Sequence, residues 1–153
     1  MPAVARVSSS RSGPSRAAVG TARSTARRDS GGQAGRYRLP GASRIRKSTE
    51  IRTVLRRGKR RRTAHLDVFF APSPASRSRL GLIVGKQGHR VVERNRLKRR
   101  LRELGRTRLL PALYDAGLAV DVLLRARREA YEASFRTLAR EVEEITEMVC
   151  SHA

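Results

Sequence analysis

The sequence is poor in cysteine, aromatic residues and long apolar runs, and each shortage excludes a class of protein. With Cys150 as the single cysteine, no disulfide framework can form within the chain, so we expect a protein of a reducing compartment, the cytoplasm. No apolar run approaches the roughly 18 residues that cross a bilayer, and residues 1–35 lack the apolar core of a secretory signal. Three Phe, three Tyr and no Trp predict a small core of modest stability.

Acidic residues are also scarce, and the resulting charge points to a polyanionic partner. Lys and Arg number 35 against 13 Asp plus Glu, which gives a net charge of +22. A solvated surface would mix both signs, whereas a nucleic acid gains from each phosphate that is neutralised. Residues 41–110 hold 22 basic and four acidic residues, while residues 111–153 hold five and eight. The charge therefore belongs to the middle of the chain and to a basic N-terminal segment.

The composition divides the chain into two parts. Residues 1–40 are rich in Arg, Ser, Gly and Ala and contain one acidic residue, which predicts a disordered basic arm. An organellar transit peptide or an over-extended start has the same composition, and the sequence leaves these alternatives open. Residues 41–150 are predicted to form one nucleic-acid-binding domain.

Hydrophobic periodicity predicts a small α+β domain with helices packed on a sheet, in the order α-β-β-α-β-α. Ser48 is expected to cap the first helix and Gly58 to follow its end. A highly basic loop facing a partner is predicted at residues 59–62, and Ser134 is expected to cap a last helix with an acidic, solvent-facing side and an apolar side. That apolar side contains Phe135, Leu138, Val142, Ile145 and Val149. The predicted helices are residues 48–57, 91–110 and from 135 on, and the predicted strands are residues 65–71, 80–85 and 119–125.

The helix predicted at residues 91–110 carries the pattern most informative about function. Leu97, Leu101 and Leu104 form one stripe that should be buried. On the other side, a band of cations and one amide faces away from the core: Arg94, Asn95, Lys98, Arg99, Arg102 and Arg106. Guanidinium groups bind phosphate oxygens as a fork, so this band is typical of a helix that contacts the phosphates of a nucleic acid. A merely solvated helix would pair its arginines with acids, and only Glu103 is available nearby.

The acidic residues and histidines do not form a pattern typical of a nuclease that acts alone. The four acids of residues 41–110 do not fall at metal-ligand spacing, and one cysteine with three dispersed histidines makes no zinc site. His65 and Asp67 share a strand face, but such a pair is more often a surface pair than an acid–base dyad. We therefore expect no catalytic residues in this chain.

A family resemblance rests on the run from Val92 to Glu103. Its pattern V-x-R-N-R-x-K-R-x-x-R-E resembles the RNR motif of the bacterial ribonuclease P protein family. The surroundings are similar in order and spacing: R-I-R at residues 44–46, R-L-G-L-I-V-G-K at residues 79–86 and D-V-L-L-R-A-R at residues 121–127. The resemblance covers residues 43–149 and leaves the arm outside it.

The resemblance implies an α/β sandwich around a central, mostly antiparallel four-stranded sheet. This sandwich fold is also known from the second domain of ribosomal protein S5. Compared with the order predicted from periodicity, it has one more strand, α-β-β-(β)-α-β-α, and it contains a left-handed βαβ crossover. It further implies a protein subunit that binds the catalytic RNA of ribonuclease P and the 5′ leader of precursor tRNA. The RNA would then perform the hydrolysis with Mg²⁺ that it largely holds itself. Neither DNA nor a membrane is expected as a partner.

The same resemblance assigns residues by position. Those expected to contact the catalytic RNA are Arg94, Asn95, Arg96, Lys98, Arg99, Arg102 and Arg106, of which Arg106 is added by the helical band. Those expected to line a leader cleft between the first helix and the sheet are Ile51, Leu55, Asp67, Phe69 and Lys86. Family members often have Phe at positions 51 and 55 and an apolar residue at 67. Asp67 near a phosphate chain is unfavourable unless it holds an arginine or a hydrated metal.

Two other RNA- or DNA-binding functions and a protein-only nuclease compete with this interpretation. A non-enzymatic ribosome-associated protein would share the composition and the basic helix but would not need a leader cleft. A DNA-binding helix would normally come with a turn and partner helix or with a dimer seam, and neither is visible. A protein-only nuclease lacks the acids that its chemistry requires.

Overall fold

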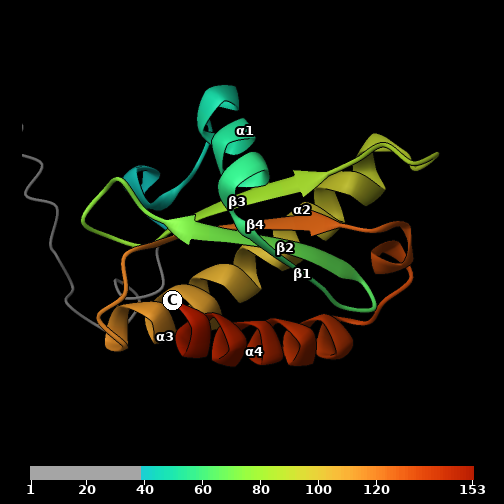
Figure 1. The fold of residues 1–153 in the computed structure, drawn as a ribbon. Coiled ribbons are helices and arrows are strands. Elements are labelled where there is room, and N and C mark those ends of the chain that lie inside the picture. The colour runs from blue at the N-terminus through green and yellow to red at the C-terminus, as the bar shows by residue number, and fades with distance from the viewer. Residues whose placement is uncertain (1–38) are drawn as a thin grey trace, which may run out of the picture. The chain divides into compact units, whose positions relative to one another are not determined.

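The computed structural model describes residues 39–153, which form a sheet covered by helices on both faces (Figure 1). The arm predicted over residues 1–40 lies outside the described residues except for Leu39, which is buried, and Pro40. No helix of the described part is long and apolar enough to cross a membrane. The helices and strands are α1 (Ser48–Arg57), β1 (Lys59–Arg62), β2 (Leu66–Pro72), β3 (Arg79–Val84), α2 (Val91–Leu104), α3 (Leu110–Asp115), β4 (Val120–Ala126) and α4 (Phe135–His152).

The four strands lie in the order β1-β2-β4-β3. The pairs β1–β2 and β2–β4 are antiparallel, and β3–β4 is parallel, with α2 and α3 in the connection between them. Helix α1 covers one face of the sheet, and the other three helices cover the opposite face (Figure 1). This confirms the predicted α+β class and the fourth strand that the resemblance implied.

Strand β1 corrects the prediction of a loop at residues 59–62. Its residues Lys-Arg-Arg-Arg are all exposed, yet their backbone pairs with β2 in register from Lys59 opposite Phe70 to Arg62 opposite Asp67. An edge strand needs only one paired side, so it tolerates charged side chains on both faces. The Nζ of Lys59 lies 6.0 Å from the centroid of the Phe70 ring, so this side chain also partly covers an apolar residue.

The helix predicted at residues 91–110 is interrupted. Leu97, Leu101 and Leu104 are buried as predicted, but α2 ends at Leu104 and a π-helical turn, Gly105–Leu109, leads into α3. A Cβ at Gly105 would stand 2.2 Å from Cδ2 of Leu80 on β3. Glycine therefore lets α2 approach the sheet closely at the point where the helical geometry changes.

Helix α4 begins where the sequence predicts. The hydroxyl of Ser134 accepts a hydrogen bond from the backbone N–H of Thr137 at 3.1 Å, which confirms the cap. The apolar residues predicted for its inner side are buried, except for Phe135, which is 42% exposed, so that assignment was wrong. Periodicity gives the side of a helix on which a residue lies but not where the neighbouring layer ends.

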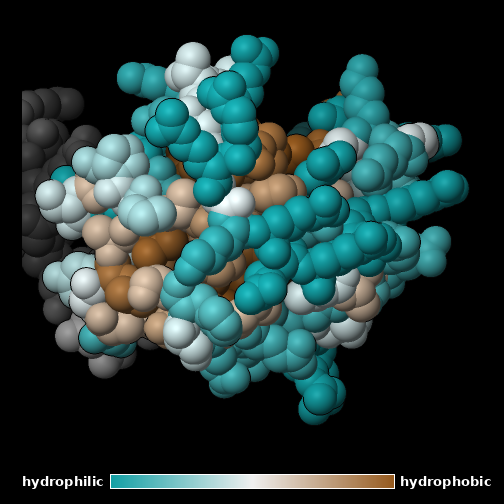
Figure 2. Space-filling view, viewed as in Figure 1, coloured by the Kyte–Doolittle hydropathy of each residue, from teal (hydrophilic) through white to brown (hydrophobic). Residues whose placement is uncertain are grey.

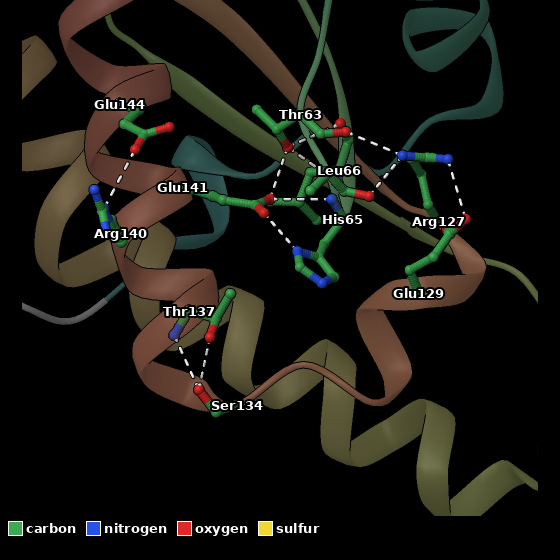
Figure 3. A network of polar contacts seen from close by, with 11 residues as sticks. Thr63, His65, Leu66, Arg127, Glu129, Ser134, Thr137, Arg140, Glu141 and Glu144 are labelled. Atoms are coloured by element: carbon green, nitrogen blue, oxygen red, sulfur yellow. Dashed lines mark hydrogen bonds and ion pairs between the residues drawn. The ribbon is translucent and has the colours of Figure 1, made fainter.

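The predicted acidic, solvent-facing side of α4 is wrong at one position, Glu141, which is buried (Figure 3). Its carboxylate accepts hydrogen bonds from the hydroxyl of Thr63 at 2.7 Å and from the backbone N–H of His65 at 3.2 Å, and it lies 2.5 Å from Nδ1 of His65. These bonds tie the β1–β2 turn to α4. His65 therefore pairs with Glu141 and not with Asp67, although the latter is a near neighbour in sequence.

Helix α1 is fixed to the sheet by an arginine at the start of β3. The buried guanidinium of Arg79 donates to Asp121 on β4 at 2.8 and 2.6 Å and to Glu50 on α1 at 2.8 Å. The hydrogen bond to Asp121, opposed by desolvation and assisted by Glu50, raises the pKa of Arg79 above its ordinary value. The predicted cap by Ser48 is wrong, because Lys47 occupies the N-cap and Ser48 is the first helical residue.

Candidate nucleic-acid interface

The cationic band predicted on residues 94–106 lies on α2 and the turn that follows it. The leucine stripe holds the helix against the core, so the opposite side is free to contact a partner. Within residues 39–153, no side-chain hydrogen bond or ion pair engages six of the seven predicted RNA-contacting residues: Arg94, Asn95, Arg96, Lys98, Arg99 and Arg102. The seventh, Arg106, is paired with Glu103 at 2.6 Å. The six can therefore meet phosphates without first breaking a bond inside the described part of the protein.

The two carboxylates near this band are already engaged. Glu103 binds Arg106, and Glu93 accepts from the backbone N–H of Arg90 at 2.9 Å and lies 3.1 Å from Nδ1 of His89. The backbone hydrogen bond, followed by the contact with His89, lowers the pKa of Glu93 below its ordinary value. Glu93 caps the helix and Glu103 pairs with Arg106, so these acids leave the charges of Arg94, Lys98, Arg99 and Arg102 uncompensated.

Tyr131, which the sequence analysis missed, positions the loop that leads into α2. Its ring stacks on His89 with centroids 3.7 Å apart, and its hydroxyl donates to the carbonyl of Gly85 at 2.5 Å. Desolvation is the main cause that raises the pKa of Tyr131, while the nearby charge of Arg94 opposes it. A pocket of about 430 Å³ lies beside this stack and includes Arg96 in its lining. No periodic pattern in the sequence signals this contact.

The residues predicted for the leader cleft lie on the face of the sheet that α1 covers, here called the α1 face. Phe69, which is 7% exposed, belongs to the cluster against which Ile51 and Leu55 pack. Asp67 lies two residues before Phe69 on β2 and so points to the same face. Figure 2 shows hydrophobic atoms visible beside α1, between hydrophilic side chains that project from this side of the molecule. The structure therefore brings four of the five predicted residues to one face.

The fifth residue, Lys86, does not lie on a strand of the sheet or on α1. It is exposed and follows the end of β3 at Val84, which is level with Ala126 on β4 and hence with Leu66 at the start of β2. Lys86 is therefore beyond the end of the sheet at which Asp67 lies. Within residues 39–153 its side chain makes no hydrogen bond or ion pair.

Arg60 on β1 also lies on the α1 face; the sequence analysis expected residues 59–62 to face a partner but did not assign Arg60 to the leader cleft. Its guanidinium binds the carboxylate of Asp67 at 3.1 Å and lies over the Phe69 ring, 5.7 Å from the centroid. The side chain of Arg60 remains 56% exposed, whereas that of Asp67 is 11% exposed. Asp67 thus holds an arginine, which was one of the two conditions that would make a carboxylate acceptable there. The position of Asp67 indicated from the sequence that an arginine or a metal should lie beside it, but the sequence did not identify Arg60 as that partner.

The site offers charge and apolar surface but no metal ligands of its own. Among residues 39–153, no three His, Cys, Asp or Glu side chains gather where they could hold a metal ion. The arrangement is suited to binding a phosphate backbone along α2 and unstacked bases on the α1 face.

The chain is similar to one family of known proteins over nearly all of its described residues. The family model for ribonuclease P matches residues 39–150. The chain is similar to the ribonuclease P protein component of Syntrophobacter fumaroxidans, at 40% identity over 64% of this chain and 80% of the relative. It is 34% identical to that of Acidothermus cellulolyticus over 70% of this chain and 88% of the relative.

Solved structures show the same fold at low sequence identity. The RNase P protein of Staphylococcus aureus superposes with a TM-score of 0.60 at 22% identity, over 70% of this chain and 94% of that one. The RNase P protein of Thermotoga maritima gives a TM-score of 0.59 at 22% identity, over 69% and 96%.

Proposed function

Since the chain belongs to the ribonuclease P protein family, and is thus a protein component of the tRNA-processing endoribonuclease, we propose that α2 binds its catalytic RNA and that the α1 face binds the precursor-tRNA leader. The observation that carries the first half is the set of cations on α2 without partners inside the described part of the protein. Their side chains project from a helix that three buried leucines hold in place, so phosphate binding requires little reorganisation.

The second half rests on Arg60 and Phe69. Phe69 is buried and its ring lies beneath the guanidinium of Arg60, so the group presented to a ligand is the guanidinium. Unstacked RNA bases stack on arginine planes as well as on aromatic rings. Asp67 fixes that plane at 3.1 Å and so limits the entropy lost on binding. Arg60 in this way supplies a stacking surface to a chain that has Ile51 and Leu55 at positions where family members often have phenylalanine.

The hydrolysis itself is assigned to the RNA subunit, with Mg²⁺ held mainly by RNA phosphates. The contribution of this chain is to gain affinity for the substrate and to supply positive charge, which lowers the Mg²⁺ concentration that the complex requires. Its partners in this proposal are the catalytic RNA and precursor tRNA.

The test compares two adjacent arginines of β1 that face opposite sides of the sheet. The holoenzyme would be reconstituted with a bacterial ribonuclease P RNA, and its affinity would be measured for precursor tRNA with a leader and for mature tRNA. Arg60→Gln should weaken binding of the leader-bearing tRNA by about tenfold, which is the loss of one stacked base, and leave mature tRNA unaffected. Arg61→Gln, level with Val68 on the α4 side, is the control with the same change in charge. Equal losses for both tRNAs, or an equal effect of Arg61→Gln, would contradict the leader assignment.

A further inference from the structure

The segment before α1 bonds to the outer edge of the sheet at one point. The backbone N–H of Ile45 donates to the carbonyl of Leu80 at 2.9 Å, and Arg44 forms an isolated parallel bridge with Leu80 on the edge strand β3. Ile45 is buried on the α1 face, where it contacts Gly81. Because side chains alternate along an extended chain, Arg44 points to the opposite face, where α2 packs, and the exposed Arg46 follows two residues later.

A third arginine reaches this place from α2. Leu80 packs against Gly105 directly after α2, and Arg102 lies one helical turn earlier. Desolvation, followed by the positive charges of Arg46 and Arg102, lowers the pKa of Arg44 below its ordinary value. The positive charges of Arg46 and Arg102, from two separate segments, therefore both act on Arg44.

No group in the described part of the protein compensates this charge. The Nε of Arg44 is buried and has no hydrogen-bond partner, and neither Arg46 nor Arg102 makes a side-chain hydrogen bond or ion pair within residues 39–153. Glu50 is taken by Arg79, and Glu103 by Arg106. A buried polar group without a partner and a cluster of like charges both cost stability in the free protein. Both costs are reduced if an anion with several acceptor oxygens binds there.

We propose that Arg44, Arg46 and Arg102 form a binding site for one phosphodiester group of the RNA backbone. The site rests on the proposed function and extends it, because it carries the RNA path from the cationic band of α2 onto the edge of the sheet beside β3. Two of its three residues lie outside the RNR run, in the segment before α1. A guanidinium fork can hold two oxygens of one phosphate, and the single negative charge of that phosphodiester offsets part of the repulsion among the three cations.

The experiment measures affinity of the full chain for a labelled bacterial ribonuclease P RNA at several KCl concentrations. Arg44→Gln should weaken binding by about tenfold and should reduce the slope of log Kd against log salt by about one, as for the loss of one phosphate contact. Arg46→Gln, at an exposed side chain, should act in the same direction without touching a buried group. Arg140→Gln on α4, whose side chain is 83% exposed, removes the same charge elsewhere and should leave affinity and slope unchanged.

Stability separates this site from a structural role. Because Arg44→Gln relieves repulsion, the melting temperature of the free protein should stay the same or rise while RNA affinity falls. Wild-type affinity for both Arg44→Gln and Arg46→Gln, together with weakened binding by Arg94→Gln, overturns this site and leaves the role of α2 intact. Unchanged binding by Arg94→Gln as well overturns the proposed function and this site with it. If inorganic phosphate raises the wild-type melting temperature while both variants keep full RNA affinity, the site takes free phosphate and the RNA assignment is overturned.

Discussion

The ion pairs around Arg79 predict a large loss of stability for a change of one atom, Asp121→Asn. The substitution removes the charge that receives two hydrogen bonds, at 2.8 and 2.6 Å, from a guanidinium whose side chain is only 10% exposed. The arginine would then remain buried with Glu50 as its only carboxylate partner. Since the positive charge cannot reach water without moving β3, the cost falls on the folded state.

Breaking a buried ion pair by removing one partner costs about 3–5 kcal/mol. The lower end, about 3 kcal/mol, applies here because the amide oxygen at position 121 still accepts one hydrogen bond and Glu50 still compensates part of the charge. Glu50→Gln is the matched control. The side chain of Glu50 is 30% exposed and forms one bond at 2.8 Å, so its loss should cost only about 1 kcal/mol.

Equilibrium urea unfolding of the two variants and the wild type measures these costs. With a slope near 2 kcal/mol per molar urea, the midpoint should fall by about 1.5 M for Asp121→Asn and by about 0.5 M for Glu50→Gln. The slope should stay constant, because neither variant changes the surface exposed on unfolding. A midpoint for Asp121→Asn equal to or above that for Glu50→Gln would refute the conclusion that the buried Arg79–Asp121 pair contributes more to stability than the more exposed Arg79–Glu50 pair.

Two further predictions concern the surroundings of α2. The phenol of Tyr131 donates to Gly85 and its pKa is raised above the ordinary value of 10.0, so its stabilising contribution is present below pH 10 and is lost as the pH rises through the raised value. Between pH 8 and 11, the melting temperature of the wild type should therefore fall more steeply than that of Tyr131→Phe. Equal falls in melting temperature would contradict this. Gly105→Ala should lower the free energy of unfolding in urea by about 1–3 kcal/mol, because its Cβ would meet the buried side chain of Leu80. Gly41→Ala, with no atom within 4 Å of its Cβ, should lower it little. Equal losses of stability would contradict the close approach of α2 to the sheet.

The fold class and most elements could be predicted because their signals are local. The leucines of α2 and the alternation along β2 place apolar residues on one side at the period of their element, and the structure buries those residues as predicted. Strand β1 gave no such signal, since an edge strand of four exposed cations has no apolar alternation. The burial of Glu141 was equally hidden, because its partners Thr63 and His65 lie more than 70 residues away in sequence.

The candidate site was predictable where one element carries it. The spacing of Arg94, Lys98 and Arg102 places them on one side of a helix, and the structure leaves that side free of ion pairs within residues 39–153. Arg60 and Arg44 were missed because each acquires its surroundings from a strand or helix elsewhere in the chain. Their signal lies in the pairing of strands, which a single sequence does not specify.

The central claim is that this chain assists a catalytic RNA through α2. The most direct test is single-turnover cleavage of leader-bearing precursor tRNA by a bacterial ribonuclease P RNA at low Mg²⁺, where the RNA alone is slow, with and without this protein. The account predicts that the wild-type chain restores cleavage and that Arg94→Ala loses much of that effect, while the exposed control Arg140→Ala keeps it. A chain that binds the cognate RNA but never stimulates cleavage, or an Arg94→Ala variant as active as the wild type, would contradict it.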